Sequence, residues 1–450
     1  MTPESITHRR VLKSAIPIIL ANASVPILGA VDTGVIGQLG LAAPIGAVGI
    51  GAIILSSLYW LFGFLRMGTT GLVAQAVGAK NPAEASALLM RGLIVGGLAG
   101  LGLIALHYPL FMLALWISPA SDDVESLAWI YLSVRIWAAP AAIAIYALTG
   151  WLIGQERMRA VLVLQLGMNL LNITLDIWFV LGLGWGVPGV ALATLIAEFS
   201  GLALALYLCR DAFAGRAWMN RARIFDRARI ARMLVVNGDI MLRSVLLLAA
   251  FQAFMFIAAG LGDNALAANQ VLMQFIHITA YTLDGFAFAV EALVGAAFGA
   301  GAVSTLRRAV YICGLWSAIG AVIMALGFWL LGPWLIDTMS TNVEVRAEAR
   351  LYMVWVVLGP LIGFSSWFLD GVYIGATETR AMRIAMLQSF AVFVVALLLL
   401  VPLWGNHGLW LAMMVFYVAR TITLGLRYKG IEAAAYNQSL RPVPTASATD

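Results

Sequence analysis

The stretch SAIPIILANASVPILGAVDTGVIG, residues 14 to 37, decides the fold class. It is long enough to cross a bilayer, since a transmembrane helix needs about 20 mostly apolar residues. Asp32 lies near its downstream end, and no Lys or Arg lies within ten residues of it. A carboxyl group in hydrocarbon costs free energy and is usually retained for a function. The stretch therefore predicts a membrane-spanning helix with a functional acid.

The composition extends this interpretation to the whole chain. Of the 450 residues, 62% are apolar and 11% are charged, against about 45–50% and about 25% in soluble domains. Apolar runs recur from end to end, and we predict an all-α integral membrane protein with twelve transmembrane helices. The expected spans lie near residues 11–36, 46–77, 88–110, 126–150, 158–182, 187–209, 230–260, 265–300, 308–336, 347–376, 382–402 and 406–427.

The positive charges predict the orientation, because Lys and Arg are retained on the cytoplasmic side. With a cytoplasmic N-terminus, 22 of the 27 Lys and Arg, Arg420 among them, fall on that side. The exceptions are Arg346 and Arg350 outside, and Arg66, Arg135 and Arg243 within the membrane. We expect a multi-pass protein of a bacterial inner membrane with both termini cytoplasmic. The net charge of +5 then reflects orientation and requires no nucleic acid. A cleaved signal peptide is disfavoured because the first apolar run continues to about residue 36.

The two halves of the chain resemble each other after a shift of about 221 residues. Segment 73–81 falls on 294–302, 150–159 on 371–380, and 185–193 on 404–412. An even number of helices per half makes the copies parallel, so they are related by a pseudo-two-fold axis along the membrane normal. Such lobes are typical of alternating-access transporters. We expect an N-lobe of six helices (1–209), a cytoplasmic linker containing an interfacial helix (210–229), a C-lobe of six helices (230–428) and a disordered cytoplasmic tail (429–450).

Acids recur inside the predicted spans. They are Asp32, Asp176, Glu198, Asp239, Asp284, Glu291 and Asp370. If all were ionised and unpaired, their cost would be on the order of 20 kcal/mol, whereas folds are stable by only about 5–15 kcal/mol. We therefore expect these acids to be protonated, paired with buried arginines or in contact with water.

Helical spacing groups some of these side chains. Asn169, Asn172 and Asp176 share one face of the fifth helix and offer oxygen ligands for Na⁺ or a proton acceptor. Alternatively, the asparagines only join neighbouring helices. Asp239 and Arg243 stand at i, i+4, close enough to pair, either for function or only to hold the seventh helix in place.

The eighth predicted helix carries a polar stripe about 31 Å long at 1.5 Å per residue. A stripe of this length predicts a proton or cation path, and a stack of structural hydrogen bonds is the alternative. Its members are Gln270, Gln274, His277, Tyr281, Asp284 and Glu291.

Seven segments carry a family resemblance. In chain order they are VDTGVIGQLG, GLVAQAVGAKN, GWLIGQERMR, NLLNITLDIWFVLGLGWGVPGVALAT, NGDIMLRSVLL, LDGFAFAVEALVGAAFGAG and LDGVYIGATETRAMR. Together they resemble the multidrug and toxic compound extrusion (MATE) family, specifically its DinF-like branch. The resemblance covers residues 10 to 428. It implies an antiporter, coupled to H⁺ or Na⁺, that exports small organic cations without a cofactor, and we expect a monomer in the lipid bilayer.

The resemblance also implies site residues. Its N-lobe coupling site, where H⁺ or Na⁺ is expected, matches Asp32, Asn172, Asp176 and Thr194. Its C-lobe charged network matches Asp239, Arg243, Asp284, Glu291 and Asp370. Asp284 and Glu291 form a DGxxxxxE pattern that the first half lacks, so we expect the lobes to differ chemically. Our hypothesis is that Asp32 is tolerated because it binds an ion only in one state, with Pro17 and Pro26 allowing its helix to bend.

Two other functions remain open at this point. The buried Arg66, Arg135 and Arg243 favour a flippase of lipid-linked sugars or an exporter of organic anions, since anionic cargo would bind arginines. A membrane-embedded enzyme is disfavoured, because the sequence contains neither HExxH nor GxSxG.

Overall fold

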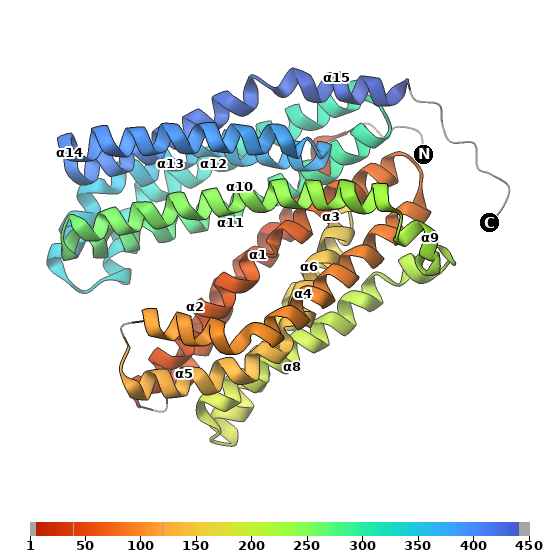
Figure 1. Cartoon of the computed structure of the whole chain (residues 1–450). Helices are drawn as coiled ribbons and strands as arrows, with labels where there is room; N and C mark the ends of the chain where they lie inside the picture. Colours follow the sequence, from red (N-terminus) through yellow and green to blue (C-terminus); the bar gives the residue numbers. More distant parts are fainter. Residues whose placement is uncertain (1–5, 39, 119, 441–450) are drawn as a thin grey trace. The chain divides into compact units, whose positions relative to one another are not determined.

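The computed structural model describes residues 6–38, 40–118 and 120–440 (Figure 1). Within these ranges every regular element is a helix and none is a strand. The expected all-helical class is therefore confirmed.

The helices of the first half follow the predicted spans, with two of the spans divided. The span expected at 46–77 consists of two helices that meet near Phe62, and the span at 126–150 is divided by a short 3₁₀ turn (Ile136–Ala138). The elements are α1 (His8–Gly37), α2 (Ala42–Trp60), α3 (Gly63–Gly78), α4 (Pro82–Ile117), α5 (Asp122–Arg135), α6 (Ala139–Gly154), α7 (Met158–Asp176) and α8 (Gly186–Leu208).

The second half is built from five long helices. They are α10 (Arg227–Gly260), α11 (Asp263–Gly299), α12 (Val303–Met339), α13 (Val343–Ala376) and α14 (Thr379–Gly425). The spans expected at 382–402 and 406–427 both lie in α14, which bends at Gly405, where φ is 54° and ψ is −128°. Glycine tolerates this non-helical conformation because it has no Cβ.

Eleven helical segments of the described chain are long and apolar enough to cross a membrane. The last of them, Thr379–Ser439, is 61 residues long and contains two of the predicted spans. All twelve predicted spans are thus helical. The structure has eleven long segments because the last two predicted spans form one continuous segment, which bends at Gly405.

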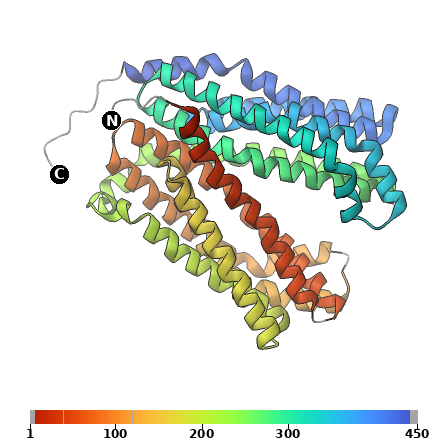
Figure 2. The same cartoon turned by 180° about the vertical axis from the view of Figure 1, so that it is seen from behind.

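The chain forms two compact units. One comprises Ile16–Thr70 and Pro82–Met241, and in it α4 packs on α6, α7 on α8, and α5 on α2 and α8. The other comprises the N-terminal segment up to Ala15, Gly71–Asn81 and the chain from Leu242 onward. In this unit α11, α12, α13 and α14 lie side by side (Figure 1). α1 is continuous over 30 residues, although Pro17 and Pro26 lie inside it (Figure 2).

The internal repeat is visible in the backbone at positions that the sequence shift brings together. Lys80, after α3, has φ 55°, and its equivalent in the second half, Gly301 after α11, has φ 65°. Glu156, after α6, has φ 58°, and its equivalent, Thr377 after α13, has φ 52°. Corresponding helices of the two halves therefore end in the same left-handed conformation.

The repeat also shapes a contact between α3 and α11. A Cβ on Gly78 would collide with the backbone of Ala296, and a Cβ on Gly299 would collide with the backbone of Gln75. The same sequence shift relates Gly78 to Gly299 and Gln75 to Ala296. A reciprocal contact of this kind is what a two-fold axis produces. The contact of α3 with α11 therefore agrees with the axis expected from the sequence.

Two expectations about the linker and the C-terminal tail are wrong. The linker is not an interfacial helix but two short 3₁₀ turns (Arg210–Phe213 and Ala217–Met219) and a single helical turn, α9 (Arg221–Ile224). Short turns leave carbonyl groups unpaired, and Arg91 of α4 donates to the carbonyls of Arg223 (2.7 Å) and Ile224 (2.9 Å).

The expected disordered tail is instead helical over α15 (Tyr428–Ser439). Ile431 and Ala435 of α15 are buried, and Arg307 of α12 donates two hydrogen bonds to Glu432, at 2.9 and 2.7 Å. This packing explains the order of a segment that is otherwise polar. Residues 441–450 of the expected tail lie outside the described residues.

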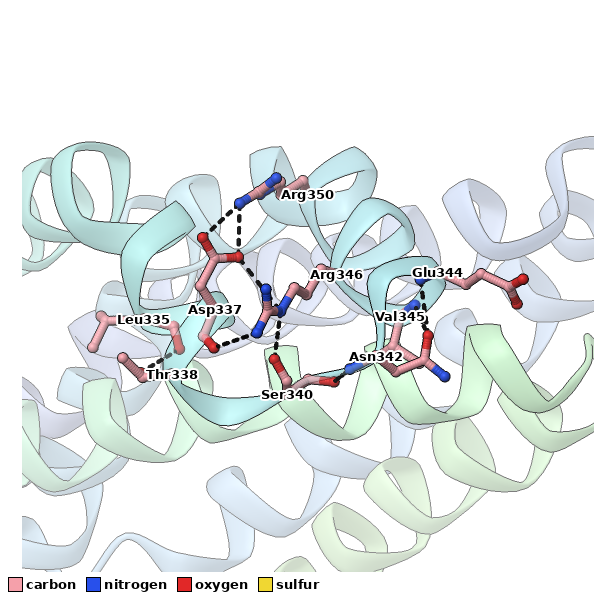
Figure 3. A network of polar contacts seen from close by, with 9 residues as sticks. All are labelled: Leu335, Asp337, Thr338, Ser340, Asn342, Glu344, Val345, Arg346 and Arg350. Atoms are coloured by element: carbon pink, nitrogen blue, oxygen red, sulfur yellow. Dashed lines mark hydrogen bonds and ion pairs between the residues drawn. The ribbon is translucent and has the colours of Figure 1, made fainter.

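The two arginines that oppose the charge bias are paired with an acid (Figure 3). Arg350 donates to both carboxylate oxygens of Asp337 at 2.7 Å. Arg346 donates to the main-chain oxygens of Ser340 (2.5 Å) and Asp337 (3.1 Å). The turn between α12 and α13 thus carries its own counter-charge.

Candidate functional site

The four residues expected in the N-lobe site come from three helices of one unit. Asp32 lies near the end of α1, Asn172 and Asp176 in the last turns of α7, and Thr194 in α8. The Asn172 amide is assigned with its nitrogen toward Asp176. In the opposite orientation its oxygen would face only acceptors and its nitrogen only donors, so neither atom could form a hydrogen bond. It then donates to Asp176 Oδ2 at 2.6 Å, and its oxygen accepts from the Thr194 backbone N–H (3.3 Å) and hydroxyl (2.9 Å).

Asp32 and Asp176 meet within this group. Their carboxyl groups lie close enough to interact directly, and two ionised carboxylates at short range repel each other, so the pair favours a shared proton or a bound cation. Asp176 is 0% exposed, which strengthens this preference. The geometry therefore provides a pair of carboxyl groups that can hold a proton or a cation.

The backbone beside this pair is irregular. α7 ends at Asp176 and continues as a π-helical turn (Ile177–Gly182). π-Turns are rare and occur frequently at functional sites. Phe179, in this turn, stacks on Trp185 with ring centroids 4.9 Å apart. No signal in the sequence predicts this turn, because its residues are ordinary members of an apolar helix.

A buried ion pair lies close enough to act on the carboxyl pair. Arg135 of α5 donates to Glu198 of α8 at 2.9 Å, and both side chains are largely buried. Arg135 also interacts electrostatically with Asp32 and Asp176. Arg135 and Glu198 each lie inside a predicted span, but they are far apart along the chain, so helical spacing does not predict that they pair.

Asn169 has a different role from Asn172. Its side chain donates to the Ser24 hydroxyl of α1 at 2.7 Å and accepts from Gln165 at 3.0 Å. It joins α7 to α1, as the structural alternative for the asparagines predicted.

The C-terminal half contains a second charged cluster, formed around Asp370 of α13. Arg243 of α10 and Arg420 of α14 both hydrogen-bond to Asp370 Oδ2. Asp239 lies one turn before Arg243 on α10 and is also buried. Arg420, expected among the cytoplasmic residues, is only 1% exposed and therefore lies inside its unit. The position of Arg420 inside the apolar run 406–427 is the feature of the sequence that indicates burial.

The polar stripe on α11 runs from the surface of its unit to the interior. Gln270, Gln274, His277 and Tyr281 are exposed, Asp284 is half-buried, and Glu291 is buried. The stripe thus extends from exposed side chains to an acid in the core of the unit.

Comparisons with known proteins agree with this architecture. The MatE family model matches residues 17–178 and 240–400. The chain is 41% identical over 411 residues to DNA damage-inducible protein F of Escherichia coli, with 91% of this chain and 89% of that protein covered. It is 26% identical over 439 residues to a probable multidrug resistance protein NorM of Pseudomonas aeruginosa, with 91% and 86% covered. A crystal structure of the Vibrio cholerae MATE transporter VcmN in the bent form superposes with a TM-score of 0.81 at 19% identity, with 96% of this chain and 98% of that chain covered.

The fold is that of a multi-pass membrane protein with two six-helix lobes. The chain belongs to the MATE family of multidrug and toxic compound transporters.

Proposed function

We propose that this chain is an antiporter of the bacterial inner membrane that exports small organic cations in exchange for H⁺ or Na⁺, with both termini in the cytoplasm. The observation that carries the proposal is the close approach of Asp32 to the fully buried Asp176. Two ionised carboxylates at short range repel each other, so such a pair favours binding of a proton or another cation. A pair of this kind can exchange one bound cation for another.

The surrounding residues support the exchange. Asn172 links Asp176 to Thr194, so two further oxygens lie beside the pair and offer the hard ligands that Na⁺ prefers. Arg135 is positively charged and favours loss of the bound cation, while Glu198 offsets part of that charge. The balance makes release of the ion feasible in a second conformation.

A bend in α1 provides the second conformation. Pro17 and Pro26 each remove a main-chain hydrogen bond from α1, so this helix bends at low cost between Asp32 and its start. VcmN of Vibrio cholerae is described in a bent form. Binding of the ion to one form of α1 and of substrate to the other couples the two ligands through one equilibrium.

The test is transport in proteoliposomes that contain the full chain. A fluorescent organic cation such as ethidium should accumulate under an imposed pH gradient or an imposed Na⁺ gradient, and the effective gradient identifies the ion. Asp32→Asn should reduce gradient-driven transport at least about tenfold, since it removes the exchangeable charge. The matched control is Asp123→Asn, at an exposed position in the first turn of α5. Equal transport by Asp32→Asn and the control would refute the coupling role.

A further inference from the structure

The cluster around Asp370 contains two arginines that hydrogen-bond to one carboxylate. Arg243, Asp370 and Arg420 are 7%, 4% and 1% exposed. Arginine keeps its charge in proteins, so two positive guanidinium groups share the Asp370 carboxylate, and the buried Asp239 lies one turn from Arg243 on α10. The groups that act electrostatically on Arg420 are Asp370, Arg243 and Tyr417, and Asp370 is the one acid among them.

Several donors of this cluster are not used within the described chain. Arg420 Nε and Nη1 and Arg243 Nε are buried without a hydrogen-bond partner, and so is the Tyr417 hydroxyl. Buried polar groups are nearly always paired, and an unpaired one indicates a missing partner or a functional constraint. The cluster therefore has two cationic side chains with unused hydrogen-bond donors that can bind an anion, and Asp370 Oδ1 is an unused acceptor beside them.

The surroundings favour a carboxylate attached to an apolar group. A guanidinium group is planar and matches the geometry of a carboxylate better than that of a spherical ion. Next to Tyr417 lie the rings of Trp367 and Phe416, with centroids 5.3 and 6.1 Å from the Tyr417 ring. Trp367 is half-buried, so this aromatic surface extends toward the exterior of the unit.

We propose that Arg243 and Arg420 form an anion site in the C-terminal half, and that its ligand is the carboxylate of a small aromatic or aliphatic molecule. The proposal rests on the transport function above in one respect, namely that such a molecule is cargo. Molecules that carry a carboxylate, including those that also carry a cationic group, are then substrates. Asp370 competes with this ligand for the two arginines and releases them when the ligand binds.

The experiment is calorimetric titration of the purified full chain in detergent, without any gradient. The probe is benzoate, and benzamide is its neutral isostere. Benzoate should bind and benzamide should not. Arg420→Gln should weaken benzoate binding at least tenfold, whereas Arg350→Gln, which removes an arginine paired with Asp337 at the turn after α12, should leave it unchanged. If Arg420→Gln does not fold, Arg243→Gln replaces it.

Asp370→Asn distinguishes an anion site from a purely structural ion cluster. It raises the charge of the cluster and removes the competing carboxylate, so benzoate should bind several-fold more tightly. Weaker or unchanged binding by Asp370→Asn would overturn the proposal, as would equal binding of benzamide. Chloride that displaces benzoate at equal concentration would refute the assignment to carboxylates. Because no gradient is used, these results are independent of ion coupling.

Discussion

The polar clusters of the two halves arrange their charges differently. In the N-terminal half Arg135 lies among three acids, whereas in the C-terminal half two arginines bind the same carboxylate, with Asp239 buried one turn from Arg243. The backbone does not share this asymmetry, since helix ends and glycine contacts recur at equivalent positions of the repeat. In that register Asp32 falls on Ala253, and Asp370 falls on Thr149. The two halves thus share an architecture, and each has its own chemistry.

The largest effect is expected from stranding a buried charge in the acidic cluster. Glu198→Ala removes the partner of Arg135 and should lower the free energy of unfolding by about 3–5 kcal/mol. The double variant Arg135→Met/Glu198→Leu should recover most of this loss, since it removes both buried charges. Unfolding in detergent mixtures measures both. A loss below about 1 kcal/mol for Glu198→Ala would mean that the pair is exposed to water, and the contrast between the clusters would be weaker.

The next effect tests the symmetric part of the comparison. Gly78→Ala and Gly299→Ala each place a methyl group against main-chain atoms of the facing helix. Each should lower the free energy of unfolding by about 1–3 kcal/mol, as overpacking does, and the two losses should be similar. Gly97→Ala in α4 is the control, because a Cβ there meets open space. Losses that differ widely between the two glycines would argue against an equivalent contact.

A smaller effect separates the two asparagines of α7. Asn169→Ala breaks the hydrogen bond to Ser24 and should cost about 1 kcal/mol of stability, without abolishing ion-coupled transport. Asn172→Ala should lose transport, because Asn172 connects Asp176 to Thr194. Transport by the two variants, corrected for the amount of folded protein, is the measurement. Equal transport by the two variants would mean that Asn169 and Asn172 do not differ in their importance for transport.

The smallest effect concerns an ion pair outside both clusters. Arg350→Ala removes the hydrogen bonds to Asp337 at an exposed turn (Figure 3). Exposed pairs contribute about 0.2–1 kcal/mol, and the loss should shrink further in high salt because such pairs are screened. A loss as large as that of Glu198→Ala would remove the distinction between buried and exposed pairs.

Much of the fold follows from the sequence, because hydrophobic length and the internal repeat can be read along the chain. The N-lobe residues were reached through a family resemblance, and the structure brings Asp32, Asn172, Asp176 and Thr194 together. The pairs that form the charged clusters were not predictable by spacing. Asp370 contacts Arg243 and Arg420, which lie on two other helices far away along the chain, and no periodicity connects positions on three different helices.

The errors in the linker and the tail have a similar origin. The helix at 428–439 depends on the Arg307 pair with Glu432 and on burial of Ile431, which are tertiary contacts of a polar segment. The linker lacks its expected helix because α4 supplies Arg91 to its free carbonyls. Local helix propensity is therefore a poor guide in segments whose structure depends on contacts with residues far away along the chain.

The central step of the proposed transport is displacement by substrate of an ion held on the carboxyl pair of Asp32 and Asp176. The most direct test is to add ethidium to the purified chain in weakly buffered detergent, with a pH indicator for H⁺ and radioactive Na⁺ for sodium. We expect the wild-type chain to release one of these ions on substrate addition, and Asp32→Asn and Asp176→Asn to release neither. Undiminished release by both variants, or bound substrate with no release by the wild-type chain, would contradict this step.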